Sequence, residues 1–187
     1  MFEPKTSEAK TTLITGGARR IGNAVAQLLH RNGHNVMIHF RHSSTEATAL
    51  RDTLNNLRPN SCQLVQADLS DSDSYQQVIT ATLTAFGQLD ALINNASSFY
   101  PTPLDNIDEQ QWTDLFASNL KAPLFLSQQA APHLQKSQGC IVNIIDIYAN
   151  RPLAEHPIYC SANVGLQMLT ISLARDLARN TLSLIHI

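Results

Sequence analysis

The chain has 187 residues, of which 43% are hydrophobic and 15% are charged. This length suits a single domain, and the composition excludes disordered, collagen-like and low-complexity proteins. Thirteen basic and fifteen acidic side chains give a formal net charge of −2, so no broad positive surface is available to bind nucleic acid or an anionic membrane. Any phosphate group must therefore be held by local contacts.

The three cysteines, Cys62, Cys140 and Cys160, are widely spaced and form neither a zinc-binding pattern nor a disulfide framework. Such cysteine usage is typical of a reducing compartment. The sequence has no apolar signal-peptide core at its start and no run of about 18 uncharged apolar residues. We therefore expect a cytoplasmic protein with no metal site and no membrane-spanning helix.

Short runs rich in Val, Ile and Leu alternate with longer segments whose apolar residues recur every three or four positions. The short runs, residues 11–15, 36–40, 63–67, 89–94 and 140–145, predict buried parallel strands. The longer segments, residues 21–31, 45–57, 73–86, 109–136 and 157–180, predict helices. This alternation predicts an α/β fold with a Rossmann-like doubly wound parallel sheet.

The end of the sequence is unusual for such a fold. Only seven residues follow the last predicted helix, whose apolar face would normally pack under a further strand. We therefore expect a five-stranded sheet and a chain that is truncated at its C-terminus.

A turn with the sequence TGGARRIG, residues 15–22, joins the first predicted strand to the first predicted helix. Glycines at this place let the backbone approach a pyrophosphate at the helix N-terminus. Because Arg20 stands where GxGxxG has its middle glycine, the motif alone does not establish a dinucleotide site, and a solvated basic turn remains the alternative. The expected cofactor contacts in this turn are Gly16, Arg19, Arg20 and Ile21.

The second predicted strand ends at Phe40 and is followed by Arg41, His42 and Ser43. No acidic residue is present there to bind a ribose 2′-hydroxyl, which favours NADP over NAD. Arg20, Arg41 and Ser43 are suited to hold a 2′-phosphate, since a guanidinium supplies both charge and directed donors. His42 taken alone is more often a surface histidine than a ligand. The expected contacts here are Phe40, Arg41, His42 and Ser43.

Two further loops are expected at the same edge of the sheet. Asp68 and Leu69 follow the third predicted strand. The Asp68 carboxylate suits an adenine amino group, and a cap for the next helix is an equally good interpretation. Asn95, Ala96 and Ser97 follow the fourth predicted strand, where ligands collect in open α/β folds. We therefore expect all five residues to contact the cofactor.

Together with Asn119 and Tyr159, these elements resemble the short-chain dehydrogenase/reductase family, in which the same places carry TGxxxGxG and NNAG. The resemblance covers nearly the whole chain. Residues 94–104, NNASSFYPTPL, are similar to the active-site segment of the pteridine reductases within that family. Two departures from the general family pattern agree with this subgroup: Arg20 replaces a glycine, and Asp146 stands where most members have a catalytic serine.

The resemblance implies NADP(H) as cofactor and a small-molecule pterin or folate as substrate. A pterin would stack between the nicotinamide ring and Phe99, with Ser97 and Arg20 hydrogen-bonding its polar edge. Hydride would pass from NADPH, while Tyr159, assisted by Asp146, would contact both cofactor and substrate and deliver the proton. The substrate contacts implied are thus Arg20, Ser97, Phe99, Asp146 and Tyr159.

Three further expectations follow from the resemblance. Asn119 belongs to a proton relay in the wider family, and a structural role at a distortion of its helix is equally plausible. The long last helix is a subunit contact in the family, which implies a homotetramer or dimer. A single NADP-binding domain over residues 1–187 would lack the C-terminal strands and the substrate loop that the family normally adds.

The family motif Tyr-x-x-x-Lys is broken, because the chain has Asn163 four residues after Tyr159. The Asn163 amide shares a helix face with Tyr159 and is able to bond a ribose hydroxyl, but it supplies no positive charge. A neighbouring ammonium would favour the phenolate by lowering the pKa of Tyr159. On this basis we expect Asn163→Lys to raise activity.

Three hypotheses remain open at this point. The chain is a working NADPH-dependent pteridine reductase, a catalytically impaired NADP- or pterin-binding homologue, or a reductase of another carbonyl or imine. Phe99 together with Asp146 argues against simple ketones as substrates.

Overall fold

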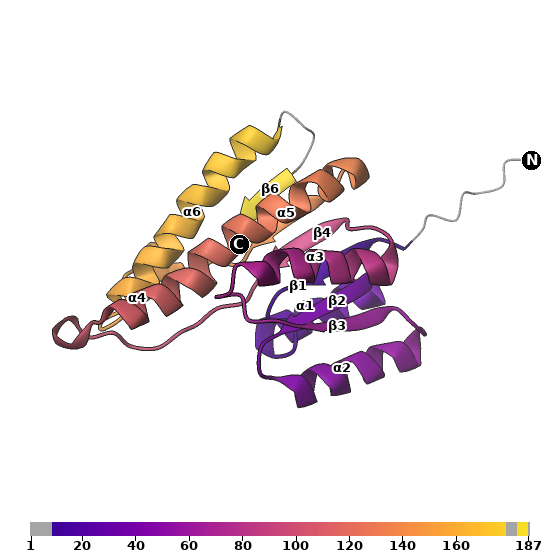
Figure 1. Ribbon diagram of the computed structural model, residues 1–187, viewed down its shortest axis with the longest axis horizontal. Coiled ribbons are helices and arrows are strands. Elements are labelled where there is room, and N and C mark those ends of the chain that lie inside the picture. The colour runs from indigo at the N-terminus through magenta and orange to yellow at the C-terminus, as the bar shows by residue number, and fades with distance from the viewer. Residues whose placement is uncertain (1–8, 179–182, 187) are drawn as a thin grey trace, which may run out of the picture.

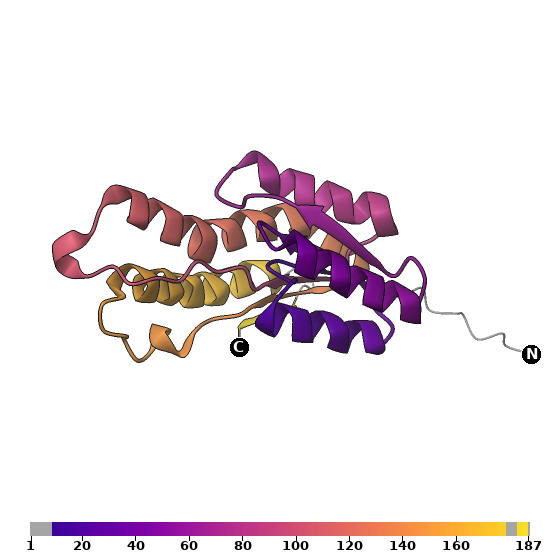
Figure 2. The ribbon, with the colours of Figure 1, turned by 90° about the horizontal axis from the view of Figure 1, so that it is seen from below.

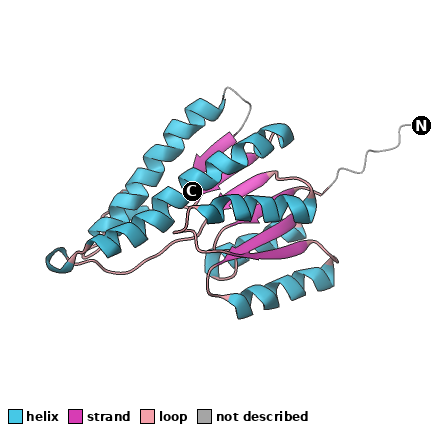
Figure 3. Ribbon diagram, in the orientation of Figure 1, coloured by secondary structure: helices cyan, strands magenta, loops and turns pink. Residues whose placement is uncertain are grey.

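A computed structural model describes residues 9–178 and 183–186 of the chain. Its centre is a sheet of six parallel strands in the order β3-β2-β1-β4-β5-β6 (Figures 1 and 3). The strands are β1 Thr11–Ile14, β2 Asn35–Phe40, β3 Cys62–Gln66, β4 Ala91–Asn94, β5 Cys140–Asn143 and β6 Ser183–His186. The predicted Rossmann-like doubly wound parallel sheet is confirmed.

Helices cover both faces of this sheet (Figure 2). The helices are α1 Arg20–Arg31, α2 Ser44–Leu57, α3 Asp73–Phe86, α4 Glu109–Phe116, α5 Ala122–Ser137 and α6 Pro157–Ala178. On one face, Ile14 and Ile38 of the sheet pack against Leu50 and Leu54 of α2. On the other face, Leu13 and Met37 share a second core with residues of α3 and α5 such as Ile79, Leu126 and Leu134. Successive residues of one strand thus bury opposite sides, as a parallel sheet with two covered faces requires.

A sixth strand, β6, corrects the expected count of five. It pairs with β5 in parallel, with register from Cys140↔Ser183 to Asn143↔His186, and it contacts α6. Residues 183–186 lie within the seven residues that follow the last predicted helix, a stretch that we interpreted as a truncated end and not as a strand. The last two residues of the predicted helix 157–180 lie outside the described residues.

The predicted helix 109–136 is divided in the structure. Between α4 and α5 lies η2, a five-residue π-helical turn from Ala117 to Lys121. Pro123, the second residue of α5, has no backbone N–H to donate to the carbonyl four residues earlier. The winding therefore loosens for one turn and tightens again in α5. Such π turns are frequent at functional sites.

The order of the strands reverses between β1 and β4, which are neighbours in the sheet although α1, β2, α2, β3 and α3 separate them in sequence. Ligands of doubly wound folds bind where the order reverses, at the carboxyl ends of the strands. The loops after β1 and β4 meet at this place. Among the described helices, none is both long and apolar enough to cross a membrane.

Candidate active site

The turn after β1 depends on two glycines. Gly16 has a φ of +60°, and a Cβ on it would lie 2.9 Å from the Ala96 Cα. A Cβ on Gly22 would overlap the carbonyl oxygen of Gly16. The start of α1 has neither a side-chain cap nor an acidic residue in its first turn. Its amide groups and the close backbone approach fit a pyrophosphate.

Arg20 occupies the first position of α1 with a φ of +49°. This left-handed conformation costs an L-residue about 1–2 kcal/mol and is the one that glycine adopts freely. The backbone at Arg20 thus has a conformation that a glycine would adopt without strain, although the residue carries a long side chain. Arg19 and Arg20 are both exposed, and the Nε of Arg19 lies 3.6 Å from the Glu46 carboxylate.

His39 was missed by the sequence analysis. Its ring is 2% exposed, and its Nδ1 accepts a hydrogen bond from the Gly16 N–H at 3.2 Å. The Nε2–H therefore donates to the Ala67 carbonyl at 3.0 Å, which defines a neutral ring. Burial lowers the pKa of His39, in agreement with that state. A single histidine within the apolar run VMIHF was the available signal.

Asn95 and Ala96 fasten the loop after β4 to the same turn. The Asn95 amide donates to the carbonyls of Thr15 and Gly16 at 2.9 and 3.0 Å. The backbone N–H groups of Asn95 and Ala96 donate to the Thr15 hydroxyl at 2.9 and 3.0 Å. The Asn95 side chain therefore holds the backbone of the turn after β1, where the cofactor is expected to bind.

The residues predicted for the adenosine end come together. The Nε of Arg41 lies 3.0 Å from Asp68, and its guanidinium is also 3.9 Å from Asp114 of α4. Asp68 accepts from the backbone N–H and the hydroxyl of Ser70. The backbone hydrogen bond is the largest cause of the lowered pKa of Asp68. Because α3 begins only at Asp73, Asp68 does not cap it.

The other predicted cofactor residues fall into two groups. Phe40 and Leu69 are buried, so only their backbone atoms are available to a ligand at this edge. Ile21, His42 and Ser43 are exposed or partly exposed around it. Ser43 precedes α2 but makes no side-chain capping hydrogen bond, which leaves its hydroxyl available.

Tyr159 and Asp146 form the central pair of the predicted catalytic group. The Tyr159 hydroxyl, on α6, donates to Oδ2 of Asp146 at 2.9 Å. The other carboxylate oxygen accepts the backbone N–H of Tyr148 at 3.0 Å, within η3, a short 3₁₀ helix Ile147–Ala149. Burial first, and then Asp146, raise the pKa of Tyr159 to about 12, although Ser97 and Asn163 oppose the shift. The phenol is therefore a protonated donor at neutral pH.

Asn119 lies in the π turn and is buried. Its amide donates to the Leu115 carbonyl at 2.8 Å and to the Ser98 carbonyl at 2.9 Å. Its oxygen accepts the Ser97 hydroxyl at 2.7 Å. The contacts of the structural alternative are thus present, and they fix the loop that carries the NNAS motif. The relay role stays a prediction.

Phe99 lies beside Tyr159 with 53% of its surface exposed. The two rings meet edge to face, with centroids 4.9 Å apart. His156, which the sequence analysis did not select, stacks on Phe99 with centroids 4.8 Å apart. Four of the five predicted substrate residues, Ser97, Phe99, Asp146 and Tyr159, thus gather at one place, while Arg20 begins α1.

Asn163 is 4% exposed and lies one turn after Tyr159. Its Oδ1 accepts the backbone N–H of Asp146 at 3.0 Å, and its Nδ2 donates to the Tyr159 carbonyl at 3.0 Å. One amide hydrogen remains for the ribose contact expected from the sequence.

A buried chain of amides ties α6 to the sheet. Asn94 of β4 donates to Asn143 of β5 at 2.8 Å, and Asn143 donates to the Thr170 hydroxyl of α6 at 2.8 Å. These bonds cross the core between the strands and the helix that carries Tyr159. They fix α6 on the sheet from its buried side.

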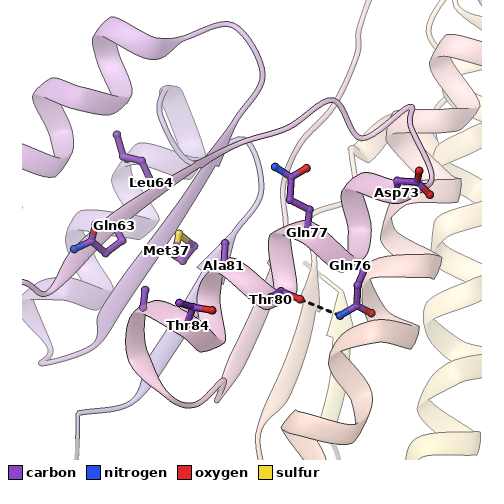
Figure 4. Close-up of a pocket in the computed structure, with 10 residues that line it drawn as sticks. Met37, Gln63, Leu64, Asp73, Gln76, Gln77, Thr80, Ala81 and Thr84 are labelled. Carbon is purple, nitrogen blue, oxygen red and sulfur yellow. Dashed lines mark hydrogen bonds between the residues drawn. The ribbon is translucent and has the colours of Figure 1, made fainter.

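A separate groove of about 590 Å³ lies between β3 and α3 (Figure 4). Its wall on α3 is polar, where Gln76 donates to Thr80, and its floor includes Met37 of β2. Asp73 is the one charged residue among those that line it. The groove is at the opposite end of the sheet from α6 and lacks the paired acid and hydroxyl of the Tyr159 region, so the chemistry is assigned to Tyr159.

Comparison with known proteins gives consistent relatives. The family model of the short chain dehydrogenases matches residues 10–187. The chain is 36% identical to pteridine reductase 1 of Leishmania tarentolae in an alignment of 208 positions, gaps included, which covers 91% of this chain and 72% of that protein. It is 31% identical to the 3-oxoacyl-(acyl-carrier-protein) reductase FabG of Staphylococcus aureus over 170 residues, covering 90% and 69%.

Proposed function

Because the chain belongs to the short-chain dehydrogenase family of oxidoreductases, we propose that it is an NADPH-dependent reductase of pterins. The reaction would convert a dihydropterin to a tetrahydropterin, and dihydrofolate is a second substrate to be tested. The observation that carries the proposal is the half-exposed ring of Phe99 beside the Tyr159–Asp146 pair. A relative named pteridine reductase 1 supports it.

The residues divide the work of such a reduction. NADPH supplies the hydride when it is bound. Tyr159 is protonated because its pKa is raised to about 12, so it is available as the donor of a proton to a ring nitrogen. Asp146 holds the phenol hydrogen in place through its Oδ2. Phe99 would present to an aromatic heterocycle the ring surface that His156 does not cover, and Ser97 would be a polar partner.

The preference for NADPH rests on the loop after β2. Arg41 would supply a guanidinium to a 2′-phosphate, together with Ser43 two residues later and Arg20 at the start of α1. No acidic side chain follows Phe40 directly to bind a ribose 2′-hydroxyl instead. We propose the described sheet with its helices as one NADP-binding domain.

We also propose a homo-oligomer, dimer or tetramer, that uses α6 as a subunit contact. Val164, Met168 and Ile171 recur at helical spacing on α6 and are exposed by 47%, 63% and 42%. An apolar stripe of this kind is typical of a contact surface. The free thiols of Cys62, Cys140 and Cys160 support a cytoplasmic location.

The proposal is tested by following NADPH oxidation with three substrates, dihydrobiopterin, dihydrofolate and a 3-oxoacyl thioester. We expect kcat/KM for dihydrobiopterin to exceed that for the thioester by at least tenfold. The thioester is the matched comparison, since a relative at 31% identity is named for it. Turnover of the thioester without turnover of either pterin would overturn the assignment.

A second function, a catalytically impaired NADP- or pterin-binding homologue, is favoured by one observation. Asn163 brings no cation to Tyr159, whose pKa is raised rather than lowered. Such a protein would change the fluorescence of NADPH on binding it, but would oxidise none on addition of a pterin. The same assay therefore separates the two.

A further inference from the structure

We propose that His39 is a positioning residue of the cofactor site, and that its ring holds the turn after β1 so that the first amide groups of α1 face the pyrophosphate of NADPH. The inference rests on the proposed function for the identity of that ligand. It gives a role in cofactor binding to a side chain that is 2% exposed and that acts on the turn through the backbone of Gly16.

His39 connects three neighbouring strands at their carboxyl ends. It lies on β2, which is between β1 and β3 in the sheet. Its Nδ1 accepts the N–H of Gly16, after β1, at 3.2 Å, and its Nε2–H donates to the carbonyl of Ala67, after β3, at 3.0 Å. Because each ring nitrogen has a partner, the two bonds together fix the orientation of the ring. A change in the ring is therefore transmitted to the turn after β1.

The Gly16 N–H depends on the side chain of His39, whereas the rest of the turn has other supports. The Gly17 N–H donates at 3.0 Å to the backbone carbonyl of His39, which any residue at this position would supply. Asn95 donates to the carbonyls of Thr15 and Gly16. In the part of the chain that the structure describes, the imidazole is the one acceptor of the Gly16 N–H. Loss of the ring would therefore leave the turn attached and release this amide alone.

The release of this amide matters because Gly16 does not hold its own conformation. Its φ of +60° lies in the left-handed region, and a glycine adopts both signs of φ about equally well. The peptide group between Thr15 and Gly16 is held at its carbonyl by Asn95 and at its N–H by His39. We expect this peptide group to rotate more freely once one of the two contacts is gone.

The turn directs its first two amides into the protein, which leaves the start of α1 for the ligand. The N–H groups of Gly16 and Gly17 both donate to His39. The first turn of α1 has no side-chain cap and no acidic residue, and its amide groups form the positive end of the helix dipole. The direction of these amides follows from the shape of the turn, so the bond between Gly16 and His39 acts on the ligand through α1.

This role requires a neutral ring. An imidazolium donates from both nitrogens and would place an N–H against the Gly16 N–H. Burial lowers the pKa of His39 and so preserves the acceptor at neutral pH, although the bond to Ala67 and the charge of Asp68 oppose that shift. Asp68 is itself paired with Arg41 at 3.0 Å.

The experiment measures the Kd of NADPH by fluorescence and the Kd of 2′,5′-ADP by competition. The second probe carries the phosphorylated adenosine and has no pyrophosphate, so it separates the two ends of the cofactor. His39→Leu removes both ring contacts. His39→Asn keeps an acceptor near Gly16, because its Oδ1 lies as many bonds from Cα as Nδ1 of the imidazole does. The matched control is His30→Leu, which removes another buried imidazole, bonded to Ser61 at 2.6 Å, from the far end of α1.

We expect His39→Leu to raise the Kd of NADPH by about five- to tenfold, the effect of one hydrogen bond, and that of 2′,5′-ADP by less than about twofold. His39→Asn and His30→Leu should each bind NADPH within about twofold of the parent. Exchange of the Gly16 amide with solvent should be faster in His39→Leu than in His39→Asn, and nitrogen chemical shifts should show the proton of the parent ring on Nε2. If His39→Leu does not fold, His39→Asn is compared with His39→Gln, whose longer side chain reaches toward Ala67, and His39→Asn should bind NADPH more tightly.

Three results would overturn the inference: an unchanged Kd of NADPH in His39→Leu, equal losses of NADPH and 2′,5′-ADP, or a parent ring with its proton on Nδ1. Equal losses would make His39 a support of the adenosine end through Ala67. No measurement uses a pterin. A parent that binds NADPH but reduces no pterin would therefore refute the proposed reductase, while the Kd values would still decide the role of His39.

Discussion

The turn after β1 and the loop after β5 both depart from the family pattern, but in different ways. In the turn, Arg20 replaces a glycine and keeps the left-handed φ of +49° that a glycine would adopt. In the loop, Asp146 stands where most members have a serine and Asn163 stands where the motif has a lysine, and the Asp146 N–H donates to Asn163 Oδ1. The change in the turn keeps a backbone conformation, whereas the changes in the loop alter the charge and the hydrogen-bonding groups beside Tyr159.

The largest expected effect comes from a change at Tyr159, which contacts the loop after β5 and leaves the turn after β1 intact. Tyr159→Phe removes the proton donor, and we expect pterin reduction to fall by about 10²- to 10⁴-fold. In the parent the rate should stay level as the pH rises from about 7 to about 10, because the acid form of Tyr159 persists until the pH nears its pKa of about 12. The NADPH dissociation constant separates a chemical loss from a binding loss. Retention of more than a tenth of the parent rate would contradict the assignment.

The next effect concerns the first region. Arg41→Ala should weaken NADPH by about 1.5–3 kcal/mol, the value of a charged hydrogen bond, and leave NADH nearly unchanged. Titrations of both cofactors at equal ionic strength measure this. Asp68→Asn should tighten NADPH a few-fold, since Asp68 holds Arg41 in an ion pair at 3.0 Å. Arg31→Ala, which removes an exposed arginine at the far end of α1, is the control. An equal loss of NADPH and NADH in Arg41→Ala would assign the arginine to another role.

A smaller expected effect is a pH dependence of stability caused by His39, whose ring contacts the turn after β1. Burial lowers the pKa of His39 below its ordinary value of 6.5. Below that pH the unfolded chain binds more protons than the folded one, so the free energy of unfolding falls as the pH drops from 6.5 toward the folded pKa. The slope from one histidine is at most about 1.36 kcal/mol per pH unit. Urea unfolding between about pH 7.5 and pH 5.5 measures it.

His39→Gln supplies the control for this slope, because glutamine keeps a donor and an acceptor and does not titrate. The slope should become shallower without vanishing, since burial also lowers the pKa values of His30 and His34. If the free energy of unfolding of the variant depended on pH as steeply as that of the parent, His39 would not contribute to the slope.

The smallest expected effect concerns Arg20, and it tests whether the turn after β1 needs the arginine side chain or only its backbone conformation. Arg20→Gly relieves the left-handed strain of about 1–2 kcal/mol and adds about 0.5–1 kcal/mol of unfolded-state entropy. The free energy of unfolding should therefore rise by roughly 0.5–1 kcal/mol, as thermal and urea unfolding would show. A loss of NADPH or pterin affinity in the same variant would show that the Arg20 side chain binds a ligand. A less stable variant would contradict the strain argument.

The elements of the sheet could be predicted because their signal is local. Runs such as residues 36–40 and the helical spacing of Leu50, Leu54 and Leu57 depend only on neighbouring residues. The residues expected at the cofactor end could also be selected, since a glycine turn and the end of a strand are recognised from a few consecutive residues, and their contact with a cofactor stays a prediction. The ion pair of Arg41 with Asp68 joins two loops and was not visible.

The parts that sequence reasoning missed depend on contacts between distant segments. His39 links Gly16 to Ala67, and each contact spans more than twenty residues. The partner of Asn163 is a backbone N–H seventeen positions away, which no motif encodes. Comparison with the family pattern predicts a loss of activity at Asn163, because it shows that the lysine charge is absent. It does not show which hydrogen bonds the asparagine forms instead.

The π turn at Ala117–Lys121 also contains one residue that the helix itself does not need. A π turn accommodates one more residue than an α-helical turn. Deleting one residue within η2 would turn the π turn into an ordinary α-helical turn and leave Leu126, which is 0% exposed, in the core. The same deletion would remove the widened turn from which Asn119 accepts the Ser97 hydroxyl. The extra residue therefore serves the site and not the packing of α5, so its loss should cost the Asn119 contacts before it costs the fold.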